Sequence, residues 1–139
     1  MIEIKENALD KETYLALREQ VGWVKLSDRQ ASMAVNNCLF NVCAYLDGTP
    51  VGMGRVVGDG AVISYIQDLV VIPKAQENGV GSMILDALKK YVEDITEPGT
   101  RMMLCLMCAK GREKFYLKHG FTARPTEKLG PGMIIYIDK

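Results

Sequence analysis

The sequence predicts an α/β (α+β) fold built on a mixed, mostly antiparallel sheet. Three strand patterns follow one another between residues 40 and 72 with only short turns between them, and strands joined in this way pair antiparallel. The strand that ends near Ile72, a helix after Gly79 and an apolar run from Met102 to Met107 then form a crossover unit. Because such a unit joins parallel strands, we expect one parallel pair in the sheet.

Composition predicts a single globular domain over residues 1–139. Hydrophobic residues make up 48% of the chain and charged residues 24%, which is typical of a packed domain. Lys plus Arg and Asp plus Glu both total 17, so the zero net charge argues against a nucleic-acid partner. No apolar run approaches the roughly 18 residues of a membrane span, and no signal-peptide pattern is present, so we expect a cytoplasmic protein without a membrane partner. The cysteines lie in or beside apolar runs, which fits reduced thiols: Cys38, Cys43, Cys105 and Cys108.

The first third of the chain predicts one strand and two helices. Residues 1–5 alternate apolar and charged side chains, as a short strand does. Asp10 is placed to cap the first helix, and Ser27 with Gln30 forms a capping-box pattern at the start of a second helix that runs to about Asn36. We expect these helices to cover one face of the sheet or a substrate cleft.

The remaining elements follow from hydrophobic period and turn residues. The three antiparallel strands are expected at Phe40–Leu46, Val51–Val57 and Ala61–Ile72. The helix after Gly79 has apolar residues at helical spacing as far as Val92. Near the C-terminus we expect a short helix, Lys110–His119, that ends at Gly120, and two further strands, Phe121–Ala123 and Met133–Ile137.

The turn from Gln76 to Gly81 joins a strand to a helix and predicts an anion site. Glycine lets the backbone approach a ligand closely, and a helix start presents free N–H groups with a partial positive charge. The turn lacks the Lys of a phosphate-binding P-loop, and Ile84 stands where a dinucleotide fingerprint has its third glycine or alanine. From these residues alone, a tight turn without a ligand remains the alternative.

Two motifs resemble those of the Gcn5-related N-acetyltransferase (GNAT) family. The strand residues 68–73, followed by Gln-x-x-Gly-x-Gly and an amphipathic helix, resemble its acetyl-CoA-binding motif. Residues 115–121, Phe-Tyr-Leu-Lys-His-Gly-Phe, resemble its second hallmark, and both motifs occur in the family's order. The resemblance implies a GNAT-like sheet of about 6–7 strands with a parallel, splayed central pair and about four helices on both faces.

The resemblance also implies site residues. The pyrophosphate of coenzyme A would be held at the turn, by Gln76, Glu77, Asn78, Gly79, Val80, Gly81 and Ser82. Leu69, Val70 and Val71 would pair with the pantetheine arm along an unpaired strand edge, and Tyr116 would protonate the departing thiolate. Many members have an asparagine seven residues before this tyrosine, whereas here the residue is Ala109.

The base that accepts the amine proton is less well defined. Asp68 is the first candidate, because it is a carboxylate in an apolar strand next to the expected cleft. A chain of water molecules is the alternative acceptor of the proton. The alternative role for Asp68 is a structural one, in which it only hydrogen-bonds a neighbouring loop. His119 lies in the last turn of a short helix, where a structural role is favoured. Cys105 and Cys108 form an isolated Cys-x-x-Cys pair, so no metal is expected.

The predicted function is transfer of an acetyl group from acetyl-CoA to a primary amine of a small molecule, by direct attack in a ternary complex. Arg55 is a candidate for the acceptor site, and the N–H of Val71 is a candidate to polarise the thioester carbonyl. The alternatives are a non-catalytic acyl-CoA-binding or regulatory module, and an acetyltransferase acting on protein N-termini or lysines. Met133–Ile137 is a candidate interface for a homodimer.

Overall fold

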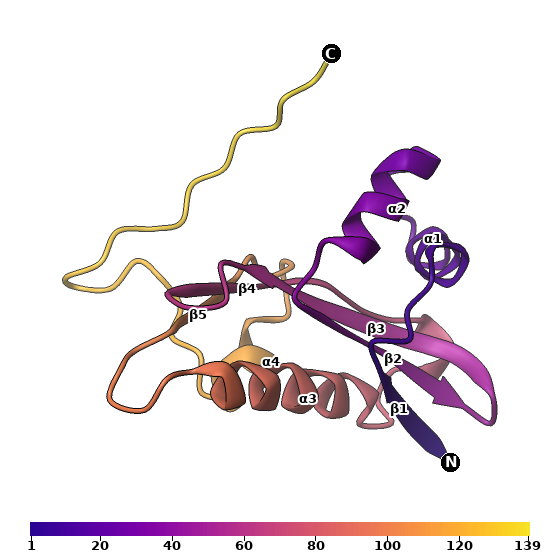
Figure 1. Ribbon diagram of the computed structural model, residues 1–139, viewed down its shortest axis with the longest axis horizontal. Helices are drawn as coiled ribbons and strands as arrows, with labels where there is room; N and C mark the ends of the chain where they lie inside the picture. Colours follow the sequence, from indigo (N-terminus) through magenta and orange to yellow (C-terminus); the bar gives the residue numbers. More distant parts are fainter. The chain divides into compact units, whose positions relative to one another are not determined.

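The computed structural model covers all residues, 1–139, and divides into two compact units, Met1–Leu106 and Met107–Lys139 (Figure 1). The first unit holds the sheet and three of the helices, and the second holds one short helix and an extended C-terminal segment. The prediction of one domain over residues 1–139 stays a prediction.

The sheet of the first unit has five strands in the order β1-β2-β3-β4-β5. The strands are β1 (Ile2–Glu6), β2 (Phe40–Leu46), β3 (Thr49–Gly58), β4 (Ile63–Val71) and β5 (Met103–Leu106). The first four pair antiparallel, and β5 lies parallel to β4 from Ile63, opposite Met103, to Ile66, opposite Leu106. The mixed sheet with one parallel pair is confirmed, with fewer strands than the 6–7 expected.

Three helices cover the two faces of this sheet (Figure 1). Helices α1 (Lys11–Gln20) and α2 (Asp28–Asn36) lie on one face, and α3 (Val80–Ile95) lies on the other. The predicted caps are confirmed, because the Asp10 carboxylate accepts from the Thr13 N–H at 2.7 Å and Ser27 with Gln30 forms both bonds of a capping box. No helix of the structure is both long and apolar enough to cross a membrane.

Two glycines of β3 let α3 lie close against the sheet. A Cβ at Gly52 would come within 2.8 Å of the Val70 carbonyl oxygen, and one at Gly54 within 2.8 Å of Leu88 Cδ1. The side chains that α3 places here, Ile84 and Leu88, are fully buried. The α3 face of the central strands is therefore core, and polar chemistry in this unit is confined to the opposite face and to the strand and helix ends.

Strand β4 contains a bulge at Asp68. Val70 pairs with Met53 and Gln67 with Arg55, so Gly54 alone faces two residues, Asp68 and Leu69. Asp68 has a φ of +58°, in the left-handed region that aspartate tolerates better than most residues. A bulge of this kind bends the strand and increases its twist, and here it begins two residues after Ile66, the last residue that pairs with β5.

The second unit contains helix α4 (Glu113–Lys118), which ends before Gly120 with a φ of +93° at the expected position. The predicted strands Phe121–Ala123 and Met133–Ile137 are wrong, because neither segment pairs with a strand. Apolar and β-branched residues favour a strand, but a strand also needs a neighbouring strand to accept and donate its backbone hydrogen bonds. The apolar residues near the C-terminus are therefore exposed: Met133, Ile134, Ile135, Tyr136 and Ile137.

Candidate functional site

The side of β4 that faces β5 loses its strand partner after Ile66. The Ile72 N–H donates to the Val51 carbonyl of β3, so the Val71 carbonyl in the same peptide group points away from β3. Backbone direction alternates along a strand, so the Val71 N–H and the Leu69 carbonyl also face this open edge. An open strand edge can pair with an extended ligand by adding a strand. No strand pairs with this side of β4 beyond Ile66, and pairing of Leu69–Val71 with the pantetheine arm stays a prediction.

The turn after β4 presents backbone N–H groups at the start of α3. Gly79 is the N-cap residue with a φ of +78°, and no side chain caps the helix. The first N–H bonded within the helix is that of Met83, which donates to the Gly79 carbonyl at 3.1 Å. The N–H groups of Val80, Gly81 and Ser82 are thus left for an external acceptor, and no acidic residue lies in the first turn.

Side chains of the same turn bind its own backbone. Asn78 Nδ2 lies 3.3 Å from the carbonyl oxygens of both Ala75 and Gln76, and Gln76 Nε2 donates to the Val71 carbonyl at 2.9 Å. Glu77 is exposed and has a φ of +68°. The bond from Gln76 to Val71 ties the turn before α3 to the end of β4, and the pyrophosphate site at this turn stays a prediction.

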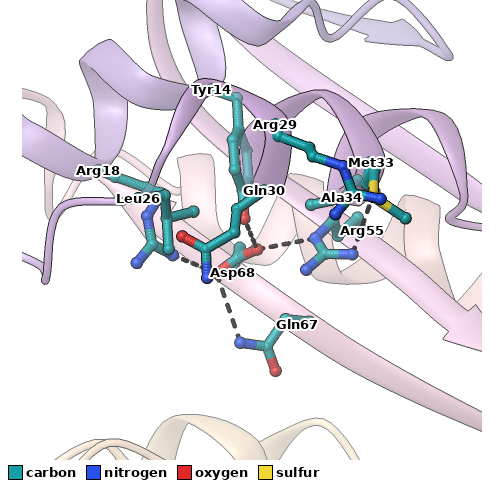
Figure 2. Close-up of a pocket in the computed structure, with 10 residues that line it drawn as sticks. All are labelled: Tyr14, Arg18, Leu26, Arg29, Gln30, Met33, Ala34, Arg55, Gln67 and Asp68. Atoms are coloured by element: carbon teal, nitrogen blue, oxygen red, sulfur yellow. Dashed lines mark hydrogen bonds and ion pairs between the residues drawn. The ribbon is translucent and has the colours of Figure 1, made fainter. Parts of the chain in front are cut away.

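A cleft of about 540 Å³ lies on the opposite face of the sheet from α3 (Figure 2). Helices α1 and α2, the segment between them, and strands β3 and β4 contribute its lining residues, which are Tyr14, Arg18, Leu26, Arg29, Gln30, Met33, Ala34, Arg55, Gln67 and Asp68. Because Gln67 and Asp68 also mark the point where the β4 edge opens, the cleft and the open edge meet at the bulge.

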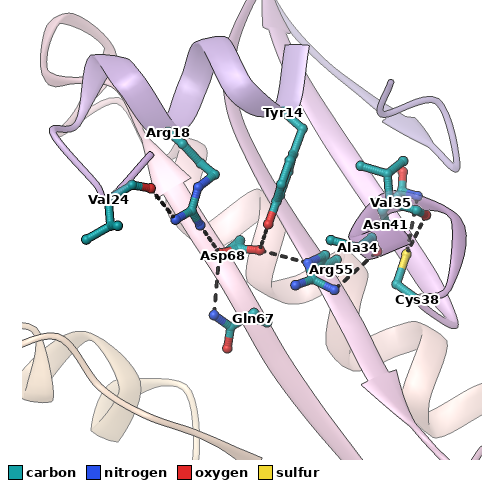
Figure 3. Close-up of polar contacts among 10 residues, drawn as sticks. All are labelled: Tyr14, Arg18, Val24, Ala34, Val35, Cys38, Asn41, Arg55, Gln67 and Asp68. Carbon is teal, nitrogen blue, oxygen red and sulfur yellow. Dashed lines mark hydrogen bonds and ion pairs between the residues drawn. The ribbon is translucent and has the colours of Figure 1, made fainter. Parts of the chain in front are cut away.

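Asp68 is the centre of the polar contacts in the cleft (Figure 3). Its Oδ2 accepts from the Tyr14 hydroxyl at 2.6 Å and from Arg55 Nε at 2.7 Å, and its Oδ1 accepts from Arg18 Nη1 at 3.0 Å and from Gln67 Nε2 at 3.4 Å. The side chain is only 1% exposed. Donors therefore occupy both oxygens, and the carboxylate holds two guanidinium groups in place. Its role as the base stays a prediction.

The partners of Asp68 are fixed in turn by their surroundings. Arg18 Nη2 donates to the Val24 carbonyl at 3.0 Å, and its guanidinium lies 5.2 Å from the ring centre of Trp23. Arg18 Nε is buried without a hydrogen-bond partner. Burial, followed by the hydrogen bond to Asp68, raises the pKa of Tyr14, so the phenol keeps the proton that it donates.

Arg55 reaches from β3 to α2 as well as to Asp68. Its Nη1 donates to the Ala34 carbonyl at 3.3 Å. Its side chain is 14% exposed and borders the 540 Å³ cleft, and its place at the acceptor site stays a prediction.

Tyr116 lies on α4 in the second unit. Its ring packs edge to face against Phe115 and Phe121, with centroid distances of 5.1 and 5.8 Å. Burial is the main reason that the pKa of Tyr116 is raised to about 12, and nearby Cys108 adds to the shift. The phenol is thus protonated at neutral pH, as an acid must be before it acts. Its catalytic role stays a prediction.

The other residues considered from the sequence are bonded in structural ways. His119 Nδ1 lies 2.8 Å from the Phe115 carbonyl oxygen. Burial and the neighbouring Glu113 raise the pKa of the Cys108 thiol, the opposite of what an activated thiolate needs. The Ala109 carbonyl accepts the Arg112 N–H at 3.0 Å, within the turn that precedes α4.

Sequence reasoning assigned only Asp68 and Arg55 to the cleft, and the residues that it missed include Tyr14, Arg18, Arg29 and Gln67. Tyr14 stands at helical spacing from Leu17 and Val21, so the sequence pattern predicts only a place on the apolar face of the first helix. Arg18 follows it by four residues and so shares that face, and a cation on a buried helix face was the available signal. Arg29 and Gln67 gave no such signal.

An open strand edge, an uncapped helix start beside it and a cleft at the same bulge define an α/β domain with the architecture of an acyltransferase. The chain belongs to the GNAT family of acetyltransferases, because the family model described as acetyltransferase (GNAT) domain matches residues 36–123, more than half of the sequence. The resemblance stated from the two motifs is therefore confirmed. No curated protein matches the sequence.

Solved structures of the same family superpose over nearly the whole chain. A protein from meticillin-resistant Staphylococcus aureus, described as a probable acetyltransferase, is 31% identical with a TM-score of 0.85, covering 99% of this chain and 100% of that one. A GNAT family acetyltransferase from Streptococcus pneumoniae is 25% identical with a TM-score of 0.81, covering 100% and 99%. An aminoglycoside N-acetyltransferase in complex with CoA is 16% identical, with a TM-score of 0.69 and coverage of 100% and 95%, and shares the fold alone.

Proposed function

We propose that this protein is an acetyl-CoA-dependent N-acetyltransferase that acetylates a primary amine of a small molecule by direct attack in a ternary complex. One observation carries the proposal: the β4 edge opens at the same bulge that borders the cleft, so two ligands can meet there from different faces. Membership of the GNAT family supports the reaction class, and the fold neighbour solved with CoA supports the cofactor.

The residues present fit coenzyme A. The N–H groups of Val80, Gly81 and Ser82 suit the pyrophosphate, and the open edge at Leu69 and Val71 suits the amides of the pantetheine arm. When bound, acetyl-CoA supplies an acetyl group activated as a thioester. The Val71 N–H faces the open edge and would donate to the thioester carbonyl oxygen, where negative charge develops during attack.

The acceptor is assigned to the cleft. A volume of about 540 Å³ lies within the range typical of small-molecule pockets, roughly 300–1,000 Å³. Helices α1 and α2 contribute lining residues on the side away from the sheet, and a cleft of this volume suits a small amine (Figure 2). Holding the amine and the acyl group at one point would supply much of the rate.

Two side chains are proposed for proton transfer. Tyr116 is proposed as the acid for the departing thiolate, on the strength of its motif and its protonated phenol. Asp68 borders the cleft, yet four donors already occupy its oxygens. This occupancy favours a water molecule in the cleft as the carrier of the amine proton, with Asp68 as a residue that positions Tyr14 and Arg55.

A second candidate function is a non-catalytic acyl-CoA-binding module. The observation in its favour is Ala109, which lacks the side-chain amide that many members of the family place at this position. Such a module would keep the edge and the helix start but would not need an ordered acceptor cleft.

The test measures free thiol released from acetyl-CoA in the presence of a panel of primary amines, together with calorimetric titration of coenzyme A. The proposal expects both binding and amine-dependent release. Binding without release on any amine, protein N-termini and lysine peptides included, would favour the module. A protein that does not bind coenzyme A at all would contradict both functions.

A homodimer and a cytoplasmic location belong to the same proposal. The apolar side chains of Met133–Ile137 are 63–89% exposed, and a second copy of the chain would cover them. All four cysteines are free thiols, which suits a reducing compartment. Light scattering should give the dimer mass for the intact chain and a lower mass after removal of residues 133–139. An unchanged mass would remove this segment from the interface.

A further inference from the structure

The cleft carries more positive charge than the chain as a whole. Three arginines line it, Arg18, Arg29 and Arg55, against one carboxylate, Asp68. Three positive charges against one negative leave a formal excess of two positive charges, although the complete sequence has a net charge of zero. The excess is therefore a property of this cleft and not of the protein's overall composition.

The excess is not neutralised by other protein groups. Asp68 contacts both Arg18 and Arg55, so one negative charge is shared between two guanidinium groups. Arg29 is exposed and makes no hydrogen bond or ion pair with the protein. Arg55 uses Nε and Nη1 for Asp68 and Ala34, which leaves Nη2 without a protein partner.

These unused donors lie in the same part of the cleft. Figure 2 shows the Arg29 side chain reaching from α2 toward the region of Arg55, which comes from β3. A planar guanidinium group presents paired donors that match a carboxylate or a phosphate. The apolar side chains of Leu26 and Met33 line the cleft beside them and suit the carbon part of a small ligand.

We propose that the acceptor is a small primary amine that also carries an anionic group, a carboxylate or a phosphate, held by Arg29 and Arg55. This inference rests on the proposed acetyl transfer and names its substrate class. A polycationic acceptor is excluded by the same charges, because each added ammonium group would face unneutralised guanidinium groups at close range.

The same charges assist the chemistry. Only a neutral amine attacks a thioester, and nearby cations disfavour the ammonium form. Arg18, Arg29 and Arg55 therefore favour loss of the amine proton once the anionic end has brought the acceptor into the cleft. The anionic group supplies attraction for binding, while the amine end is kept in its reactive state.

The test compares matched acceptors by kcat/KM for thiol release. The pairs are β-alanine with β-alaninamide, and phosphoethanolamine with ethanolamine, with spermidine as the polycation. We expect the anionic member of at least one pair to be preferred by about tenfold, the effect of one added ion pair. The two pairs distinguish a carboxylate from a phosphate. Equal or better use of the neutral members or of spermidine would overturn the inference while leaving acetyl transfer intact.

Variants of Arg29 assign the preference to the cleft. Arg29→Gln should reduce it to about threefold or less, whereas Arg29→Lys should retain most of it. Arg101→Gln removes a positive charge from an exposed residue outside the cleft and should leave the preference unchanged. A preference that survives Arg29→Gln in full would contradict the assignment to this residue.

A binding measurement makes the inference testable without turnover. Each acceptor pair is titrated by calorimetry into protein saturated with coenzyme A. Tighter binding of the anionic member, lost in Arg29→Gln, supports the inference even if no amine is acetylated, in which case only the proposed function fails. Identical dissociation constants for both members of both pairs would overturn the inference.

Discussion

The two sides of the candidate site differ in the groups that form them: backbone groups on the proposed cofactor side and side chains on the proposed acceptor side. The cofactor side consists of backbone groups, namely the open edge at Leu69–Val71 and the N–H groups of residues 80–82. The acceptor side consists of side chains that α1, α2, β3 and β4 bring together around Asp68 (Figure 3). A backbone site depends on one contiguous segment, whereas a side-chain site depends on the packing of the whole unit.

This difference predicts different responses to substitution. On the cofactor side most side chains can change without effect, and only bulk or negative charge at the helix start should matter. On the acceptor side a single side chain can alter charge, stability or selectivity, because the residues share hydrogen bonds. The variants below separate the two sides.

The largest effect is expected for Gly81→Glu, which should act on the cofactor side alone. A carboxylate among the free N–H groups would repel the pyrophosphate, at a cost of several kcal/mol, or about a thousandfold in the dissociation constant. Titration calorimetry with coenzyme A measures this. Ala16→Glu, on the exposed face of α1, adds the same side chain elsewhere and should bind normally. Normal affinity in Gly81→Glu would remove the anion site from the helix start.

Asp68→Asn should act on the acceptor side by destabilising the fold. Asparagine tolerates the φ of +58°, so the bulge can persist, but Arg18 and Arg55 lose their shared counter-charge. We expect a loss of about 3 kcal/mol in the free energy of unfolding, measured in urea. Asp86→Asn, exposed on α3, should change it little. Unchanged stability combined with a lost acid limb in the pH–rate profile would instead identify Asp68 as the base.

Tyr116→Phe tests the proposed acid without altering charge at neutral pH. Turnover should fall by about 100-fold, the usual contribution of a general acid, with little change in the affinity for coenzyme A. Stopped assays of thiol release would measure the turnover number, and calorimetry would measure the affinity for coenzyme A. An unchanged turnover number would exclude Tyr116 from the mechanism.

The smallest expected effect concerns the turnover number at alkaline pH, which ionisation of Tyr116 should leave unchanged. The pKa of Tyr116 is raised to about 12, so turnover should show no loss from its ionisation below pH 10. In the unfolded chain a tyrosine loses its proton near pH 10. Between pH 10 and 12 the unfolded state then binds fewer protons than the folded state, so stability should fall as the pH rises in that window. A Tyr116-dependent loss of turnover near pH 9 would contradict the raised pKa.

The sequence was sufficient for several elements of the fold because their signals are local. The capping residues Asp10 and Ser27, the crossover unit and the turn at Gly79 each depend on neighbours within a few positions, and the structure confirms these elements. The segment Met133–Ile137 was misassigned, because its pattern suits a strand but it forms no strand of the sheet.

The acceptor side could not be predicted in the same way. Tyr14 and Arg18 are 54 and 50 positions away from Asp68 in the sequence, and no motif links them. Asp68 has its left-handed conformation in the bulge where one residue of β3 faces two residues of β4. The position of this bulge depends on the register of the whole hairpin. A carboxylate in an apolar strand suggested chemistry, but its four donors were set by tertiary packing.

The bulge at Asp68 has a consequence for redesign of this enzyme. Its backbone lies beside the part of β4 that β5 does not pair with, and its carboxylate anchors Arg18 and Arg55. Under the proposed function, substitutions that also change the backbone at residue 68 would therefore disturb the cleft and the neighbouring strand edge together. Arg29 lines the cleft without bonding to Asp68, so the proposed acceptor selectivity can be tested there without altering the bulge.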